Sequence, residues 1–356
     1  MSLMHASSPH SHAATSTGQI MRWVLIATLP GIAAQARFFG WGIVLNVLFA
    51  AGLGVLLEAL ILRLRSRPSS LTLRDNSALV TGVLLGVSLP PFVPWWLIAV
   101  GMVAAIVVAK QLFGGLGQNP FNPAMVGYAL LLIAFPLPMT QWAAPHGLLG
   151  PEAISMGESL GYFLGLASPA DAMTGATPLD AFKHKPEAIL ASEFWAGKPL
   201  PPGTLNAWHS VALAWLAGGA LLLFKRIVSW HIPLSMLGAI ALIATLMFAG
   251  DPSHHGSPLF HLLGGAAIFG AFFIATDPVS AATSRKGKLY YGAGIGILVM
   301  VIRTFGAYPD AVAFAVLLMN FAVPFIDYYT QPRTYGHNRP NRGIKVRQID
   351  DDESAQ

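Results

Sequence analysis

Apolar stretches alternate with short polar connections over most of the sequence. A helix needs about 20 predominantly apolar residues to cross the hydrocarbon core of a bilayer, and ten stretches approach that length. They predict an all-α polytopic membrane protein with about ten transmembrane helices, at 21–37, 41–62, 77–94, 96–113, 121–138, 207–224, 231–249, 259–277, 289–306 and 309–327. The first stretch contains Pro30 and Gly31, so this helix is expected to be tilted, broken or partly interfacial.

One long polar interval separates the first five apolar stretches from the last five. It predicts two membrane halves of five helices each, joined by an extramembrane loop and flanked by polar tails. The expected division is an N-terminal tail at 1–20, a first membrane half at 21–138, a loop at 139–206, a second membrane half at 207–327 and a C-terminal tail at 328–356.

The composition supports a membrane location. Only 10% of the residues are charged and 54% are hydrophobic, whereas about 25% of the residues in soluble domains are charged. The net charge is +5, but the basic residues stand mostly at the ends of apolar stretches, so the expected partner is a lipid bilayer and not a nucleic acid. The chain has no cysteine and therefore offers no thiolate ligand for an iron–sulfur cluster.

The distribution of basic residues predicts the orientation. If the N-terminus is cytoplasmic, 16 of the 21 Lys and Arg residues lie on the cytoplasmic side, as the positive-inside rule requires. Both termini are then cytoplasmic, and the 139–206 loop lies outside, in the periplasm if the membrane is a bacterial inner membrane.

The two halves share a weak internal similarity. The stretch 80–91 resembles 268–278, and each is followed by an apolar span that ends in a basic residue, Lys110 or Arg303. Because each half has an odd number of spans, the second copy is expected to be inverted. Inverted repeats enclose sites near the membrane midplane, where helices are often broken.

The 139–206 loop contains the motif Asp171-Ala172-Met173-Thr174-Gly175-Ala176-Thr177. The small residues Gly175 and Ala176 leave the backbone beside Thr177 accessible to a bulky donor. The alternative is a simple small-residue turn before a proline. The pattern resembles the acceptor motif for covalent flavinylation, in which a flavin transferase joins FMN through its phosphate to the last threonine, here Thr177. Ala172 stands where that motif often has glycine.

Two proline-broken elements within the membrane halves carry polar residues. The connector 114–125 contains Asn119 and Asn122, which could hydrogen-bond a polar ring system; the alternative is an ordinary helix connector with proline at the next helix start. The matching element, 275–280, contains Asp277, for which a functional role and helix-end capping are both open.

Other polar and aromatic residues stand near the predicted helix ends. Glu58 lies a little over one turn before Arg63, which favours an interfacial position with an arginine partner; a role in an ion pathway is the alternative. Six aromatic residues fit an interfacial belt and are assigned no chemistry: Trp95, Trp96, Trp142, Trp208, Tyr290 and Tyr291.

Together these segments resemble the NqrB/RnfD family, membrane subunits of Rnf electron-transport complexes and of sodium-pumping NADH:quinone oxidoreductases. The likeness covers about residues 21–327 and depends on 114–125, 275–280 and the Thr177 motif. It implies covalent FMN on Thr177, two inverted five-helix repeats and non-covalent riboflavin in the membrane core. The short N-terminal tail favours the Rnf branch.

The resemblance implies a function in electron transfer. The chain is expected to carry electrons between flavins in an ion-translocating (Na⁺ or H⁺) oxidoreductase complex with RnfA, RnfB, RnfC, RnfE and RnfG. The sites then comprise Asp171, Thr174, Gly175, Ala176 and Thr177 for FMN, and Asn119, Asn122 and Asp277 for a second flavin or an ion. The alternatives are an NqrB-like quinone reductase subunit and an inverted-repeat solute channel or transporter, which bound flavin would distinguish.

Overall fold

The computed structural model describes residues 16–67, 72–145, 154–170, 173–186, 188–308 and 310–332. Asp171 and Ala172 of the acceptor motif and most of both predicted tails lie outside these residues.

In the first half of the chain, most of the described residues are helical. Its elements are α1 (Thr17–Phe39), α2 (Gly42–Leu64), η1 (Leu73–Asp75), α4 (Ser77–Ser88), α5 (Trp95–Met102), which continues into the π-helix η2 (Val103–Gln111), α6 (Pro123–Ala134) and α7 (Pro136–Thr140). The connecting loop contains β1 (Trp142–Ala143), α8 (Met156–Leu164), β2 (Thr174–Gly175), α9 (Pro178–Lys183) and α10 (Ala191–Ala196).

The second half contains longer helices around one broken segment. Its elements are α11 (Thr204–Phe224), α12 (His231–Gly250), α13 (Pro258–Leu263), α14 (Ala267–Phe269), the π-helix η4 (Gly270–Ile274), α15 (Arg285–Phe305) and α16 (Val312–Thr330).

The structure agrees with an all-helical multi-pass membrane protein. Within the described ranges, five helices are long and apolar enough to cross a membrane, namely α2, α11, α12, α15 and α16. Three further apolar helices, α4, α5 with η2, and α6, are shorter. The helix α1 is continuous through Pro30, so the broken form that the sequence allowed is not found.

Glycine and proline shorten the helices in two of the predicted spans. The helix in 77–94 ends at Ser88, just before Leu89-Pro90-Pro91, because a residue before proline avoids the helical region. The span 259–277 is divided into α13, α14 and η4, with Gly264 and Gly265 between the first two.

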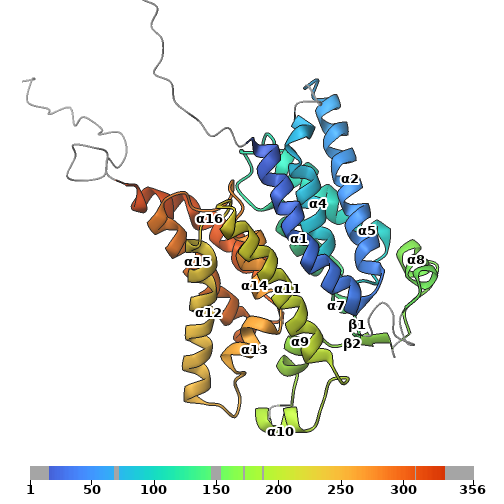
Figure 1. Cartoon of the computed structure of the whole chain (residues 1–356), viewed down its shortest axis with the longest axis vertical. Helices are drawn as coiled ribbons and strands as arrows, with labels where there is room; N and C mark the ends of the chain where they lie inside the picture. The colour runs from blue at the N-terminus through green and yellow to red at the C-terminus, as the bar shows by residue number, and fades with distance from the viewer. Residues whose placement is uncertain are drawn as a thin grey trace, which may run out of the picture.

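The two halves meet along α1 and α11, which pack side by side (Figure 1). A Cβ atom added to Gly218 of α11 would collide with the carbonyl oxygen of Ala27 on α1. A Cβ at Gly31 of α1 would collide with the ring of Trp215. Glycine at these positions therefore allows the close approach of the helices that joins the halves.

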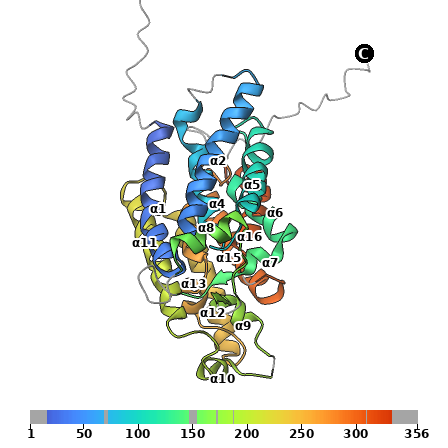
Figure 2. The same ribbon diagram turned by 90° about the vertical axis from the view of Figure 1, so that its right-hand side faces the viewer.

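The described chain ends lie at one end of the helical bundle, and the connecting loop lies at the other. In Figures 1 and 2, the start of α1 and the last turn of α16 are towards the top, whereas α9, α10, β1 and β2 are towards the bottom. We call these the terminal end and the loop end of the bundle.

Candidate functional site

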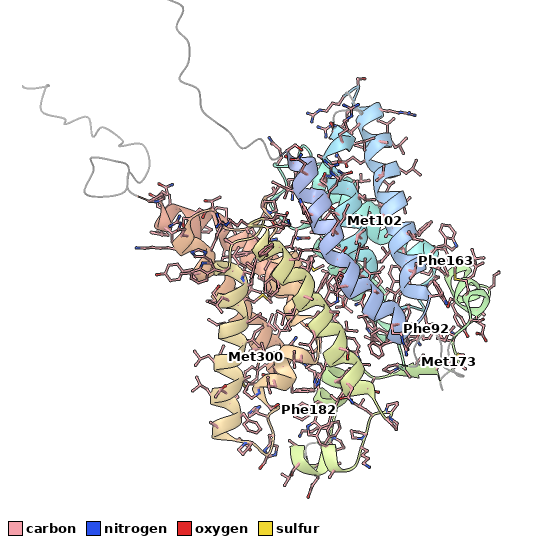
Figure 3. All side chains as sticks on the ribbon, viewed as in Figure 1. Phe92, Met102, Phe163, Met173, Phe182 and Met300 are labelled. Atoms are coloured by element: carbon pink, nitrogen blue, oxygen red, sulfur yellow. The ribbon has the colours of Figure 1, made fainter. Side chains whose placement is uncertain are left out.

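The acceptor segment is held at the loop end by a short β-ladder. Strand β2 pairs antiparallel with β1, with Thr174 opposite Ala143 and Gly175 opposite Trp142. The backbone N–H of Ala144 donates to the carbonyl of Met173 at 3.0 Å, and Met173 is labelled beside this region in Figure 3. The segment before Thr177 is thus fixed to the chain that follows the first membrane half.

Thr177 caps the short helix α9. Its backbone is extended, and its Oγ1 accepts a hydrogen bond from the N–H of Asp180 at 3.2 Å. Pro178 occupies the first helical position, where its missing N–H costs nothing. Thr177 is partly buried and its neighbour Ala176 is exposed. The turn predicted as the alternative reading of this motif therefore exists here as a helix N-cap.

The side chain of Thr177 lines a cavity between the two halves, which we call the Thr177 cavity. Asp180 and Asp310 supply carboxylates to its lining. Six aromatic residues form much of the remaining wall, namely Tyr128, Trp142, Trp208, Trp215, Phe269 and Tyr308. The cavity volume is about 130 Å³, below the range typical of small-molecule sites, so it offers ring surfaces for part of a planar ligand.

Three of the aromatic residues that the sequence assigned to an interfacial belt have other environments. Trp142 and Trp208 line the Thr177 cavity and pack edge to face with ring centroids 5.3 Å apart. Tyr291 is fully buried, so its assignment to the belt is wrong. The hydropathy pattern places these residues near span ends but does not show whether they face lipid or protein.

A second cavity, of about 370 Å³, brings together Asn119, Asn122 and Asp277. We call it the Asn122 cavity. Its lining includes Thr17 at the start of α1 and Ser77 at the start of α4, so it lies towards the terminal end. The volume falls within the range typical of small-molecule sites. The structure thus places both proline-broken elements, which are far apart in the sequence, around one space.

Asn122 links the halves at the boundary between the cavities. Its Oδ1 accepts from the N–H of Met125 at 3.2 Å, which caps α6 at Pro123. Its Nδ2 donates to the carbonyl of Ile274 at 3.2 Å, and Ile274 lines the Thr177 cavity. The helix connector considered as the alternative is therefore present, and the same residue also lines the Asn122 cavity.

Asp277 and Asn119 differ in how fully their polar atoms are bonded. Asp277 accepts from the hydroxyl of Ser280 at 2.6 Å and from its N–H at 3.2 Å, which closes a turn between η4 and α15; no helix begins or ends at Asp277, so the helix-end capping considered for it is not found. Asn119 donates to the carbonyl of Phe121 at 3.0 Å, but its buried Oδ1 has no partner among the described residues. An unpaired buried acceptor is costly, so this atom suits a ligand with an N–H donor.

Sequence reasoning missed a buried ion pair beside the Asn122 cavity. Glu58 Oε1 lies 2.7 Å from Lys110 Nζ, and both side chains are almost completely buried. Gln111 Nε2 also donates to Glu58 Oε1, at 2.6 Å. The predicted interfacial position of Glu58 with an arginine partner is therefore wrong, because the π-helical turns of η2 (Val103–Gln111) carry Lys110 and Gln111 into the bundle.

Replacing Lys110 with methionine should destabilise the protein by about 3–5 kcal/mol, because Glu58 then remains buried without its cation. The double variant Glu58→Leu with Lys110→Met should recover most of this loss, since replacing both partners removes both charges. The measurement is the midpoint of thermal unfolding of each variant in the same detergent. Equal midpoints for Lys110→Met and the wild type would contradict this account of the pair.

The helical bundle and its helices of membrane-spanning length define a multi-pass membrane protein with two internal cavities, each lined by a few polar groups. The family model described as the NQR2, RnfD, RnfE family matches residues 4–336, and the chain belongs to this family. Curated relatives carry the name of the D subunit of an ion-translocating oxidoreductase complex, and they align over nearly the full length of both chains.

Three of these relatives illustrate the similarity. The protein of Marinobacter nauticus is 53% identical over 98% of this chain and 99% of its own length. The protein of Shigella flexneri is 50% identical over 94% and 98%, respectively. The protein of Vibrio vulnificus is 48% identical over 95% and 100%. These identities match the resemblance that the sequence motifs indicated.

Proposed function

We propose that this chain is the D subunit of an ion-translocating oxidoreductase complex and carries electrons across the membrane by way of flavin covalently attached to Thr177. The main support is that Thr177, the last residue of the acceptor motif, lines a cavity whose wall includes six aromatic residues. The names of relatives with about half of their residues identical support the assignment to the complex. The proposed partners are RnfA, RnfB, RnfC, RnfE and RnfG, with a flavin transferase for maturation.

The residues around Thr177 suit a phosphoester-linked FMN. Thr177 is only partly buried, and the exposed Ala176 and the small Gly175 before it leave room for the transferase. The β1–β2 ladder fixes one side of the segment, and the aromatic rings of Trp142, Trp208 and other residues face the space beside it. Bound flavin would supply reversible electron transfer in one- or two-electron steps.

The Asn122 cavity is the proposed site of a second, non-covalent flavin, riboflavin. The free Oδ1 of Asn119 could accept from a ring N–H, and Lys110, Asn122 and Asp277 add polar groups to the lining. Riboflavin lacks a phosphate, whose charge would be costly to bury within the membrane. This chain would thus hold one flavin near each end of the bundle.

The proposed topology has ten crossings in two inverted repeats of five, within a bacterial inner membrane. The helices within the ten predicted spans and the location of the start of α1 and the end of α16 opposite the loop support this arrangement (Figure 2). The positive-inside count then assigns the terminal end to the cytoplasm and the Thr177 loop to the periplasm.

Reporter fusions should test this orientation. A fusion after Gln356 should report the cytoplasm, and a fusion within the loop near Lys185 should report the periplasm, because the five proposed crossings between them are an odd number. The readout is the activity of a compartment-specific reporter such as alkaline phosphatase. The same compartment for both fusions would mean that the number of crossings between them is even.

Mass spectrometry of the proteolytic peptide that contains Thr177 tests the proposed function directly. The peptide from protein made with the transferase should carry the mass of FMN less one water. An unmodified peptide, in a purified subunit that also holds no other flavin, would favour a channel or transporter.

A further inference from the structure

Lys183, the last residue of α9, connects the acceptor segment to the second membrane half. Its Nζ lies 3.3 Å from the carbonyl oxygen of Ile302, 3.0 Å from that of Arg303 and 3.1 Å from that of Tyr308. Three carbonyl acceptors match the three N–H donors of an ammonium group. Ile302 and Arg303 belong to the last turn of α15, where the helix dipole favours a cation; the carbonyl of Ile302 also accepts from the N–H of Gly306 at 2.9 Å.

The end of α15 to which Lys183 bonds is held in place by further hydrogen bonds. Arg303 is buried and donates to the carbonyl of His261 at 2.6 Å and to Asp310 at 3.2 Å. The other carboxylate oxygen of Asp310 accepts from the N–H of Ala266 at 2.8 Å, and Asp310 lines the Thr177 cavity. Lys183 therefore bonds to a hydrogen-bonded region that includes Tyr308 of the cavity wall.

The helix α9 transmits this attachment to Thr177 over one and a half helical turns. Leu179 and Asp180, on the same helix, line the Thr177 cavity, whereas Lys183 does not. Phe182 packs in an aromatic cluster with Phe194, Trp195 and Phe260 and is labelled at the loop end in Figure 3. This cluster keeps α9 folded independently of Lys183.

Burial lowers the pKa of Lys183, and the nearby charge of Asp180 opposes that shift. The position is therefore partly withdrawn from water, so a side chain that cannot donate there removes the ammonium donor from the carbonyls of Arg303 and Tyr308.

We propose that Lys183 is a positioning residue that docks α9 on the end of α15 and thereby holds FMN on Thr177 against the aromatic wall of the Thr177 cavity. This inference rests on the proposed flavinylation of Thr177. Docked flavin would lie near Trp142, Trp208 and Trp215, and indole rings in close contact quench flavin fluorescence. Undocked flavin would be brighter and would rotate more freely.

The test compares Lys183→Met with Lys183→Arg and with the control Lys185→Met. Lys185 lies in the same loop, but its Nζ bonds to the carbonyl of Ile189 at 3.1 Å, within the loop. Each full-length protein is purified natively after co-expression with the transferase. Covalent FMN per chain is measured after denaturation, and the fluorescence yield and anisotropy of the bound flavin are measured in the native state.

All variants should carry FMN to the same extent. Lys183→Met removes three hydrogen bonds and should raise the undocked fraction by about tenfold or more, with higher fluorescence and lower anisotropy. Lys183→Arg should restore the wild-type signals because its guanidinium can also donate to the carbonyls, and Lys185→Met should match the wild type.

Two outcomes would overturn the docking role. One is a Lys183→Met protein with the flavin fluorescence and anisotropy of Lys185→Met at equal FMN content. The other is loss of FMN from a Lys183→Met protein that melts at the wild-type temperature, because positioning acts after attachment. Absence of covalent FMN from the wild type would instead refute the proposed function.

Discussion

Replacing Thr177 with alanine should remove all covalently bound flavin while leaving the protein inserted in the membrane. Alanine has no oxygen to form the phosphoester. The structural loss is confined to one capping bond, from the N–H of Asp180 to Thr177 Oγ1, worth about 1 kcal/mol. The readout is flavin fluorescence of the protein band on a denaturing gel, with membrane insertion checked by fractionation.

Thr174→Ala is the matched control. Thr174 precedes Thr177 by three residues, in the strand that pairs with Ala143, and is proposed only as part of the motif that the transferase recognises. This variant should retain covalent flavin, at a reduced level. A fluorescent Thr177→Ala band would refute the attachment site, and loss of flavin from Thr174→Ala alone would mean that Thr174 is the acceptor.

The helical membrane architecture could be predicted from the sequence. An apolar stretch long enough to cross the bilayer finds no water there to bond its backbone, and a helix satisfies the backbone hydrogen bonds within the stretch itself. The ends of the helices were less predictable. The stretch 77–94 is predominantly apolar, but its helix ends at Ser88 because Pro90 and Pro91 follow. Hydropathy does not register this conformational effect of proline. Local proline chemistry, and not hydrophobicity, determines such boundaries.

The ion-pair partners of the buried charged residues could not be predicted from the hydropathy pattern. Lys110 follows an apolar span and counts among the cytoplasmic charges by its position in the sequence, yet it pairs with Glu58 inside the bundle. The pairing depends on how η2 packs against α2, over a large separation in sequence. The sequence shows only the spacing of residues along one helix. This spacing places Arg63 a little over one turn after Glu58 and therefore favours Arg63 as its partner.

The two proline-broken elements, 114–125 and 275–280, predicted a shared cavity better than the isolated charged residues predicted their ion-pair partners. Asn119 and Asp277 stand out in the sequence because proline-rich backbone within a membrane must line a cavity or be covered by protein, and both line the Asn122 cavity. The aromatic wall around Thr177 was missed. Trp142 and Trp208 were recognisable as aromatic residues near span ends, but only the packing of the halves shows that they face the cavity.

Riboflavin should copurify with the Thr177→Ala protein, held in the Asn122 cavity. The hydrocarbon core of a bilayer is roughly 30 Å thick, which is long for one efficient electron hop from Thr177 to the other side. The chain has no cysteine for an iron–sulfur relay, so an organic carrier within the bundle would shorten the gap. The free Oδ1 of Asn119 and the space of about 370 Å³ suit such a carrier.

The experiment is acid or solvent extraction of purified Thr177→Ala protein, followed by chromatography of the released flavin. Adding Asn119→Ala should weaken retention about tenfold, because one hydrogen bond to the ligand is lost. Adding Asn46→Ala should have no effect on retention, because Asn46 is equally buried but donates to the carbonyl of Pro90 and does not line the cavity. Absence of flavin from folded Thr177→Ala protein in mild detergent would remove the second carrier from this chain and assign the step across the membrane to its partners.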